Sequence, residues 1–336
     1  MNILLAGYDK GAQFNLEMIS NCARSRGHKV MTFFGQGIES FLNDPDWIRN
    51  ELPKFDVVIT GTASFKKDPE LALGALASRY DIPWVRFADT HSVWGGEGAR
   101  GRVGNAILLV ASPLEIEAAK AFGHRKVHYL GPPPYWRKFL EVEIPKLPGR
   151  DPGLPLIMVE GVKDASITNQ LLTVSVAACN LVFGPSGYQL VFKPHFHEPE
   201  MTLEQLEFRK QILNNVPILE TDLIPLEILP ACDLLICTGG ATDSIAAAMR
   251  RQRVIYYSSP AVRARLAKQQ GSPDWFPAVS GACQSVEGQL MALAIVRLFN
   301  EEVRAEQVAR QKEVYPDLPG DERTEEKIVD FLESLV

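Results

Sequence analysis

The sequence predicts an α/β protein made of two doubly wound, Rossmann-like domains, each with a parallel sheet, that face each other across a cleft. Three observations lead to this fold class. The chain has 336 residues, which exceeds the size at which one hydrophobic core keeps growing. Short apolar runs alternate with amphipathic stretches, as in strand-helix-strand units. This pattern is interrupted by a segment rich in Pro and Gly at 141–155 and then starts again.

The first domain is expected over residues 1–140. Its strands read as continuous apolar runs, because helices should cover both faces of a parallel sheet. Gly27 is expected to end the first helix. The expected strands are 2–6, 29–34, 55–60, 84–87, 106–111 and 127–130, and the expected helices are 14–26 and 69–80.

The second domain is expected over residues 156–320, after a linker at 141–155. It repeats the order of the first domain, and a C-terminal helix at 321–336 follows it. Thr324 is a candidate N-cap for that helix. The expected strands are 156–159, 189–192, 217–219, 233–237 and 253–257, and the expected helices are 166–181, 203–214, 225–229 and 243–250.

The composition argues against several classes of protein. A formal net charge of -6 argues against a nucleic-acid partner, because phosphate backbones are held by surplus Lys and Arg. Five scattered cysteines without a C-x-x-C pair indicate neither a disulfide framework nor a zinc site, and a cytoplasmic location fits best. We expect no signal peptide and no transmembrane segment. A homodimer is compatible with the sequence.

The best-marked binding site is Thr238-Gly239-Gly240, which lies between an apolar strand and a helix. In open α/β sheets, ligands bind outside the carboxyl ends of the strands. Two glycines let the backbone approach a ligand, and the helix that follows directs N–H groups and positive dipole toward a phosphate. Thr238 and Thr242 add hydroxyl groups. The alternative is a plain tight turn in which Thr242 or Asp243 caps the helix.

This segment lies in a run, residues 225–258, that resembles the donor-nucleotide region of glycosyltransferase-B-fold proteins. That superfamily contains nucleotide-sugar glycosyltransferases and UDP-N-acetylglucosamine 2-epimerase-like proteins. Gly239 and Gly240 match its glycine pair, and Thr238 falls where many members carry Ser. The resemblance implies that these residues contact the diphosphate of a nucleotide-sugar donor.

The resemblance also assigns a side to each domain. It implies that residues 1–140 bind the acceptor and that residues 156–320 bind the donor. Many members carry a Glu in the helix after the glycine pair that holds the nucleotide ribose. The helix here offers only Asp243 or Ser244 near that place, so the sequence departs from the pattern at the ribose.

A second match lies in LVFKPHFHE, which resembles a strand end of the superfamily with the pattern hydrophobic-K-x-H-P. Lys193 and His195 are the matched pair. A lysine can pair with a diphosphate, and a histidine can bind phosphate or exchange a proton near neutral pH. The alternative is a solvated lysine beside a packed loop histidine. His195, His197 and Glu198 could also form a metal cluster, but no further ligand is evident, and we expect no metal.

The first strand-to-helix loop of each domain is a further candidate site, because its backbone N–H groups can bind oxygen atoms. In the donor domain, Gly161 and Lys163 are the candidates. In the acceptor-side loop, the candidates are Gly7, Tyr8, Lys10 and Gly11. A lone G-x-x-x-G is not a dinucleotide fingerprint, so a dehydrogenase is poorly supported.

The segment FADTHSVWGGEGARGR follows an expected strand of the first domain and is dense in charged residues. It lies where the epimerases carry an H-x-E-x-G loop, although the match is loose. Asp89, His91 or Glu97 could remove a proton from an acceptor hydroxyl. The alternative is a flexible surface loop in which Asp89 caps a turn.

These observations predict a glycosyltransferase-like enzyme that moves a sugar from a nucleotide-sugar donor to an acceptor. The acceptor could be a glycan, a small molecule or a lipid-linked group, and no cofactor is expected. One alternative is a nucleotide-sugar 2-epimerase, which acts on a single substrate. Another is a non-catalytic nucleotide- or sugar-binding protein of the same fold, which the absent ribose Glu would favour.

Overall fold

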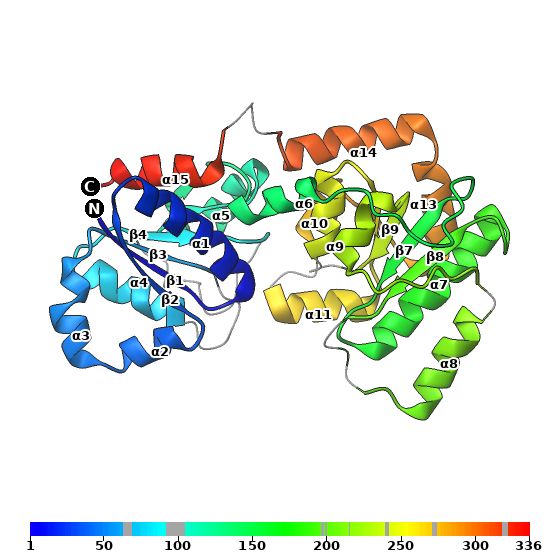
Figure 1. The fold of residues 1–336 in the computed structure, drawn as a ribbon, viewed down its shortest axis with the longest axis horizontal. Helices are drawn as coiled ribbons and strands as arrows, with labels where there is room; N and C mark the ends of the chain where they lie inside the picture. Colours follow the sequence, from blue (N-terminus) through cyan, green and yellow to red (C-terminus); the bar gives the residue numbers. More distant parts are fainter. Residues whose placement is uncertain are drawn as a thin grey trace. The chain divides into compact units, whose positions relative to one another are not determined.

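A computed structural model describes residues 1–62, 69–91, 105–195, 198, 200–214, 216–238, 242–270, 274–317 and 322–336, with only the backbone of 268–270. The chain divides into two units. Unit 1 is Met1–Arg137, Gln269–Gly271 and Pro316–Val336, and unit 2 is Lys138–Lys268 and Ser272–Tyr315. Each unit contains one parallel sheet covered by helices (Figure 1). The prediction of two doubly wound α/β sheets is therefore confirmed.

Unit 1 has a six-stranded sheet in the order β2-β1-β3-β4-β5-β6, and every neighbouring pair is parallel. The strand order reverses at β1, because β2 lies on one side of it and the later strands lie on the other. The strands are β1 (Asn2–Gly7), β2 (Lys29–Phe34), β3 (Val57–Thr60), β4 (Trp84–Phe87), β5 (Ile107–Leu109) and β6 (Lys126–His128). The helices include α1 (Lys10–Ser25), α2 (Gly37–Leu42), α3 (Pro45–Asn50), α4 (Pro69–Arg79) and α5 (Ile116–Phe122).

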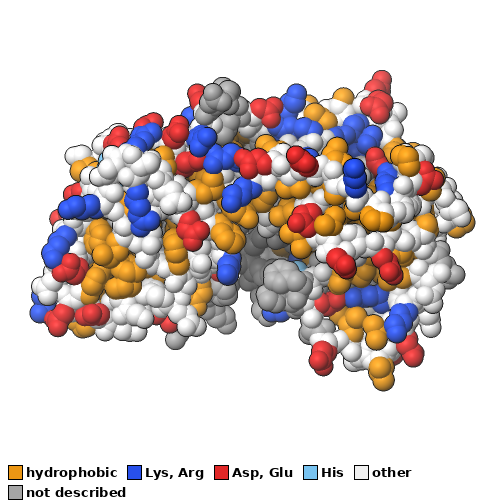
Figure 2. All heavy atoms as spheres, in the orientation of Figure 1, with side chains coloured by type: hydrophobic (Ala, Val, Ile, Leu, Met, Phe, Trp, Pro, Cys, Tyr) orange, Lys and Arg blue, Asp and Glu red, His pale blue; other side chains and the backbone are white. Residues whose placement is uncertain are grey.

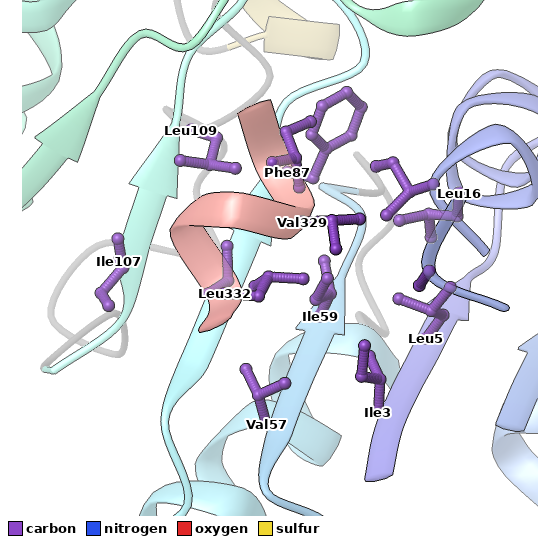
Figure 3. Close-up of a cluster of buried hydrophobic side chains, with 14 residues drawn as sticks. Ile3, Leu5, Leu16, Val57, Ile59, Phe87, Ile107, Leu109, Val329 and Leu332 are labelled. Carbon is purple, nitrogen blue, oxygen red and sulfur yellow. The ribbon is translucent and has the colours of Figure 1, made fainter. Parts of the chain in front are cut away.

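The core of unit 1 consists of apolar clusters on both faces of the sheet. On one face, alternate residues of β1 and β3 pack against α1 and the C-terminal helix α15 (Thr324–Glu333). Figure 3 shows Val329 and Leu332 of α15 directed at this cluster. On the other face, the intervening strand residues pack against Leu71, Leu73 and Ala77 of α4. The sequence did not indicate which domain the C-terminal helix contacts, and the structure assigns it to unit 1.

Unit 2 has a five-stranded parallel sheet in the order β11-β10-β9-β7-β8. The order reverses at β7, because β8 lies on one side and β9 lies on the other. The strands are β7 (Leu156–Glu160), β8 (Gln189–Lys193), β9 (Leu234–Cys237), β10 (Arg253–Tyr257) and β11 (Gln284–Val286). The helices are α6 (Arg137–Glu141), which starts in unit 1, and α7 (Ala165–Phe183), α8 (Leu203–Leu213), α9 (Pro225–Ile228), α10 (Thr242–Met249), α11 (Pro260–Gln270), α12 (Phe276–Val279), α13 (Met291–Leu298) and α14 (Glu301–Val314).

Several expected boundaries differ from the structure. The expected strand 217–219 is only an isolated bridge between Leu190 and Ile218. Helix α1 begins at Lys10, so the first loop is shorter than the expected 7–11. Thr324 is the first residue of α15 and not its N-cap, which is Arg323 and makes no capping bond through its side chain. The Thr324 side chain instead lies against Gly131.

The segment expected to be a linker is bound to the sheet of unit 2. Arg150 pairs with Asp233 at 3.2 Å, between its Nη2 and Oδ2 atoms, and also donates to the side chain of Gln189. The backbone N–H of Asp151 donates to the same Gln189 side chain at 2.8 Å. Polar contacts to β8 and to the start of β9 therefore hold residues 150–151 in place.

No transmembrane segment is expected from the sequence, and one helix meets the length and composition of such a segment. Helix α7 is long and apolar enough to cross a membrane by length and composition, and no other described helix meets both criteria. Its buried residues pack in the core of unit 2, which accounts for its apolar composition. All five cysteines are free thiols, and four of them are buried. On the face drawn in Figure 2, charged side chains of both signs are interspersed.

Candidate functional sites

The topological switch point of unit 2 brings together the chain segments that follow β7 and β9. These two strands are neighbours, and the connections leave them toward opposite sides of the sheet. Ligands of open α/β sheets bind at such points, outside the carboxyl ends of the strands. Gly161 follows β7 and Thr238 follows β9. The predicted donor-site residues Gly161 and Thr238 therefore lie at the edge where a ligand is expected.

Thr238 is buried and has a cationic neighbour that sequence reasoning missed. The Nη2 atom of Arg265, on α11, lies 3.4 Å from the Thr238 hydroxyl oxygen. Burial lowers the pKa of Arg265, and the charge of Asp164 partly opposes this effect. Because 27 residues separate Arg265 from Thr238, no local motif indicates their contact. Gly239 and Gly240 lie outside the described residues.

The loop after β7 is held closely against the sheet. The Thr168 hydroxyl donates to the Val162 carbonyl and accepts from the Val162 N–H, both at 2.9 Å. A Cβ atom at Gly161 would lie 2.7 Å from the Thr168 methyl group, so a glycine is required there. Asp164 caps α7 by accepting from the backbone N–H groups of Ser166 and Ile167. Lys163 is exposed beside this fixed loop.

A pair of buried carboxyl groups also lies at this edge. Glu160, the last residue of β7, and Asp243, in the first turn of α10, are hydrogen-bonded to each other. Burial raises both pKa values, and the Asp243 charge raises the pKa of Glu160 further. When two carboxyl groups are in contact, the state in which they share one proton is more stable than the state in which both are ionised, because two negative charges repel each other. Asp243 was predicted, whereas Glu160 was missed; its signal is an acidic residue that ends an apolar strand.

Lys193 is the last residue of β8, an edge strand of the same sheet, and His195 follows the strand. The Lys193 ammonium group donates to the Thr221 carbonyl, and burial lowers its pKa. His195 is partly exposed. Glu198 is bound on both carboxylate oxygens by Arg209 of α8, at 2.7 and 2.8 Å. Glu198 thus anchors this loop to α8, and this contact does not favour the metal cluster that was the alternative. His197 lies outside the described residues.

Thr242 is exposed at the first position of α10. Three arginines at and after the end of this helix bind backbone carbonyl groups. Arg250 donates to the Phe139 carbonyl at 2.8 Å, Arg251 donates to the Tyr315 carbonyl at 2.7 Å, and Arg253 donates to the Leu298 carbonyl at 2.9 Å. They bind distant backbone segments of unit 2.

In unit 1, the segment after β1 is fixed by a buried acid. The Tyr8 N–H donates to the carboxylate of Glu70, in the first turn of α4, at 2.8 Å. The Tyr8 carbonyl accepts from the Gln13 side chain at 2.8 Å. Gly7 ends β1 against Leu16, and Lys10 is exposed at the start of α1. Glu70, which sequence reasoning missed, therefore holds the backbone of the predicted acceptor-side loop.

Asp89 lies after β4, against the start of α1. A Cβ atom at Gly11 would lie 2.3 Å from the Asp89 Oδ2 atom, so the missing side chain of Gly11 makes room for this carboxyl group. Burial, followed by the charge of Asp9, raises the pKa of Asp89 to about 7. A group with a pKa near neutrality can accept and release a proton efficiently. Asp89 is thus a chemically competent acid or base.

His91 has a different environment from the one expected of a catalytic base. Its Nδ1 atom lies 3.0 Å from the Glu115 Oε2 atom, and both side chains are fully buried. The His91 ring also packs against Trp136, with centroids 5.4 Å apart. These contacts favour a role in fixing the chain after β4. Glu97, the third candidate, lies outside the described residues.

No protein-family model matches the chain, and no curated protein matches it by sequence. Solved structures, in contrast, match along its whole length.

Three of these solved structures illustrate the similarity. MurG of Acinetobacter baumannii is 14% identical with a TM-score of 0.62, and the match covers 99% of each chain. The UDP-N-acetylglucosamine 2-epimerase of Neisseria meningitidis, bound to UDP-N-acetylglucosamine, is 10% identical with a TM-score of 0.61, covering 99% of this chain and 100% of that one. The glycosyltransferase SnogD of Streptomyces nogalater is 13% identical with a TM-score of 0.54, covering 99% and 98%. At these identities the similarity concerns the fold.

Proposed function

Because this chain has the glycosyltransferase-B fold, we propose that it is a nucleotide-sugar-dependent glycosyltransferase whose donor binds at the switch point of unit 2. Solved proteins of this fold include a glycosyltransferase and an epimerase that holds UDP-N-acetylglucosamine. A uridine diphosphate sugar is therefore the first donor to test. The acceptor would receive the sugar through a hydroxyl group.

The observation that carries the proposal is the contact between Arg265 and Thr238. A guanidinium group can bind phosphate oxygens through two parallel N–H groups. The end of β9 is the position at which a diphosphate would meet the start of α10, whose dipole also favours an anion. Arg265 would neutralise the charge that develops on the diphosphate as it leaves. We expect this cation to replace a metal ion, so that EDTA leaves binding unchanged.

The proposed reaction needs one proton acceptor. The acceptor hydroxyl would transfer its proton to Asp89, its oxygen would form a bond to the anomeric carbon, and the bond from that carbon to the diphosphate would break. The pKa of about 7 for Asp89 suits this transfer near neutral pH. His91 would position the chain after β4, rather than exchange the proton itself.

The proposal is tested by titrating the full chain with UDP in a calorimeter. We expect Arg265→Gln to weaken UDP binding about tenfold or more, because a hydrogen bond to a charged group contributes about 1.5–3 kcal/mol. Arg263→Gln is the matched control: Arg263 lies on the same helix, about half exposed, and pairs with Asp274. Equal UDP affinity for both variants, or no binding by the wild type, would refute the donor site.

An epimerase is the second candidate. It is favoured by the carboxyl groups of Asp89, Glu160 and Asp243, whose pKa values are all raised. Inversion at a sugar carbon needs groups that remove and return a proton, and Glu160 with Asp243 could provide one such group in unit 2. Incubation with UDP-N-acetylglucosamine and no acceptor distinguishes the two. Accumulation of the 2-epimer, followed by NMR, would replace the transferase proposal. If UDP binds and neither reaction occurs with a panel of acceptors, the chain is a binding protein.

A further inference from the structure

A groove between α7 and α8 has no part in the proposed donor site. The two helices lie side by side in unit 2 (Figure 1). The groove has a volume of about 620 Å³, within the range of small-molecule sites. Its lining includes Ser166, Gln170 and Thr173 from α7, and Glu204, Gln205 and Phe208 from α8. We call this site, whose lining also includes Asn169 and Val174 of α7, the α7–α8 groove.

Polar contacts join α7 and α8 beside this groove. The Arg209 Nε atom donates to the Asn169 side-chain oxygen at 2.7 Å, and the Asn169 amide donates to the Gln205 carbonyl at 3.3 Å. Arg209 also holds Glu198 with both terminal nitrogens and lies over the Phe192 ring, 5.2 Å from its centroid. These directional bonds link α7 to α8 and α8 to the segment that precedes it.

Helix α8 is unusual because little of it is buried. Arg209 is its one buried residue, whereas Phe208 and Leu203 are 47% and 79% exposed. Phe208 faces the groove, and Leu203 does not line it. An exposed ring at the edge of a groove is available to stack on a ligand.

The chemistry of the lining limits the class of ligand. None of the described residues that line the groove is a Lys or an Arg that could hold a phosphate or another anion, and Arg209 beside it is engaged by Asn169 and Glu198. Val174 is the only aliphatic side chain among them, which disfavours an acyl chain. The remaining groups are amides, hydroxyls, one carboxylate and the Phe208 ring. Hydrogen-bonding groups beside an aromatic face suit an uncharged polyhydroxylated ligand.

A second, smaller cavity of about 240 Å³ also borders α7. It shares Gln170 and Val174 with the groove and is also lined by Ser258, Ser259 and Gln289. Its lining again combines hydroxyl and amide groups. The two cavities therefore offer consecutive positions for a ligand with more than one similar unit.

From these contacts we infer that the α7–α8 groove binds a neutral oligosaccharide, which stacks one ring on Phe208 and hydrogen-bonds to Gln170 and Gln205. This inference does not depend on the proposed transferase activity, because no residue of the groove belongs to the predicted donor site. The groove would hold a glycan on unit 2 whether the glycan is an acceptor, a product or an anchoring chain.

The inference is tested by titrating the full chain with maltohexaose and with chitohexaose, and with hexagalacturonate as an anionic counterpart. We expect binding of at least one neutral hexasaccharide, and weaker or no binding of hexagalacturonate. Phe208→Ala should weaken the neutral interaction about tenfold or more through the loss of apolar contact. Leu203→Ala, an apolar truncation on the same helix outside the groove, should leave it unchanged. The melting temperature and UDP affinity of both variants should equal those of the wild type.

Three outcomes would overturn the inference. In the first, neither neutral hexasaccharide binds, or Phe208→Ala binds it as well as the wild type does. In the second, saturating UDP displaces the hexasaccharide, which would assign the groove to the donor site. In the third, Phe208→Ala converts a dimer to a monomer in sedimentation, which would show that a second copy covers the groove. The Arg265→Gln variant separates this inference from the proposed function. We expect it to lose UDP binding and to keep hexasaccharide binding, because Arg265 does not line the groove.

Discussion

Three carboxyl groups near the carboxyl ends of the strands have pKa values that their surroundings raise. In unit 1, the Asp89 carboxyl group occupies the space left by Gly11, next to Asp9. In unit 2, Glu160 and Asp243 are hydrogen-bonded to each other beneath the end of the sheet. Asp89 is partly exposed, whereas Glu160 and Asp243 are buried, and acids with raised pKa values concentrate at functional sites. Such acids lie near the carboxyl ends of the strands in both units, so we expect each of these two places to be a functional site.

Asp89 should make the stability of the chain depend on pH. Its folded-state pKa, about 7, lies above the ordinary value of 3.8, so between these values the folded chain holds a proton that the unfolded chain has lost. Stability should therefore fall as pH rises from about 4 to about 7, and it should stay low above pH 7. Thermal unfolding followed by calorimetry at pH 5, 6, 7 and 8 measures this loss.

Asp89→Asn should reduce the difference in melting temperature between pH 5 and pH 8, because an amide does not ionise. Asp46→Asn is the control, since Asp46 is exposed on α3. If Asp89→Asn and Asp46→Asn show the same pH dependence as the wild type, Asp89 does not hold a proton at neutral pH, and its assignment as the proton acceptor fails with it.

At the scale of elements, the contact of α4 with the sheet depends on one glycine. The buried ring of Trp84 on β4 lies directly against Gly74, where a Cβ atom would be 1.8 Å from the Trp84 Cε2 atom. The Trp84 indole also donates to the Thr60 hydroxyl at 3.0 Å, so the ring cannot move without losing this bond. Close helix-sheet approach therefore explains a glycine in the middle of a helix.

Gly74→Ala should lower the free energy of unfolding by about 1–3 kcal/mol, the range for overpacking a filled core. Gly37→Ala is the matched control, because Gly37 begins α2 and has no atom within 4 Å of an added Cβ. That variant should be neutral or slightly more stable, since alanine favours a helix over glycine. Urea denaturation measures both, and equal stability of the two variants would contradict the tight packing of α4.

At the scale of the whole molecule, the chain returns to unit 1 at its C-terminus. Val329 and Leu332 of α15 complete the cluster that contains Ile3, Leu5 and Ile59 (Figure 3). Polar contacts strengthen this placement: His28 pairs with Glu333 at 2.7 Å and Arg137 pairs with Glu325 at 2.9 Å. The sheet of unit 1 therefore depends on residues that are synthesised after all of unit 2.

Leu332→Ala should destabilise unit 1 by about 2–5 kcal/mol, because it leaves a cavity in a filled core. Hydrogen exchange measured by mass spectrometry should become faster in β1 and β3, while β7 and β9 exchange at the wild-type rate. Val336→Ala is the control, since Val336 is 66% exposed. Equal acceleration in the sheets of both units would show that α15 does not stabilise unit 1 selectively.

The sequence alone determined the fold class, most strands and the strand ends at which a ligand is expected. Each of these follows from local patterns, because a buried parallel strand is a short apolar run and a loop next to it contains glycine or polar residues. The match of LVFKPHFHE and of residues 225–258 with one superfamily added the expected donor. Helix boundaries were less accurate, as at Lys10 and Thr324, because the first turn of a helix is set by its neighbours as well as by its own residues.

Only the tertiary structure decided which side chains meet. Arg265 reaches Thr238 from another helix, Glu160 meets Asp243 across two elements, and His91 is buried against Glu115. None of these pairs is close in sequence, so no periodicity or motif indicates them. The pKa of Asp89 and the position of α15 likewise depend on contacts between distant segments. A local pattern determines which element forms, whereas the packing of elements determines the charge, burial and partners of each group.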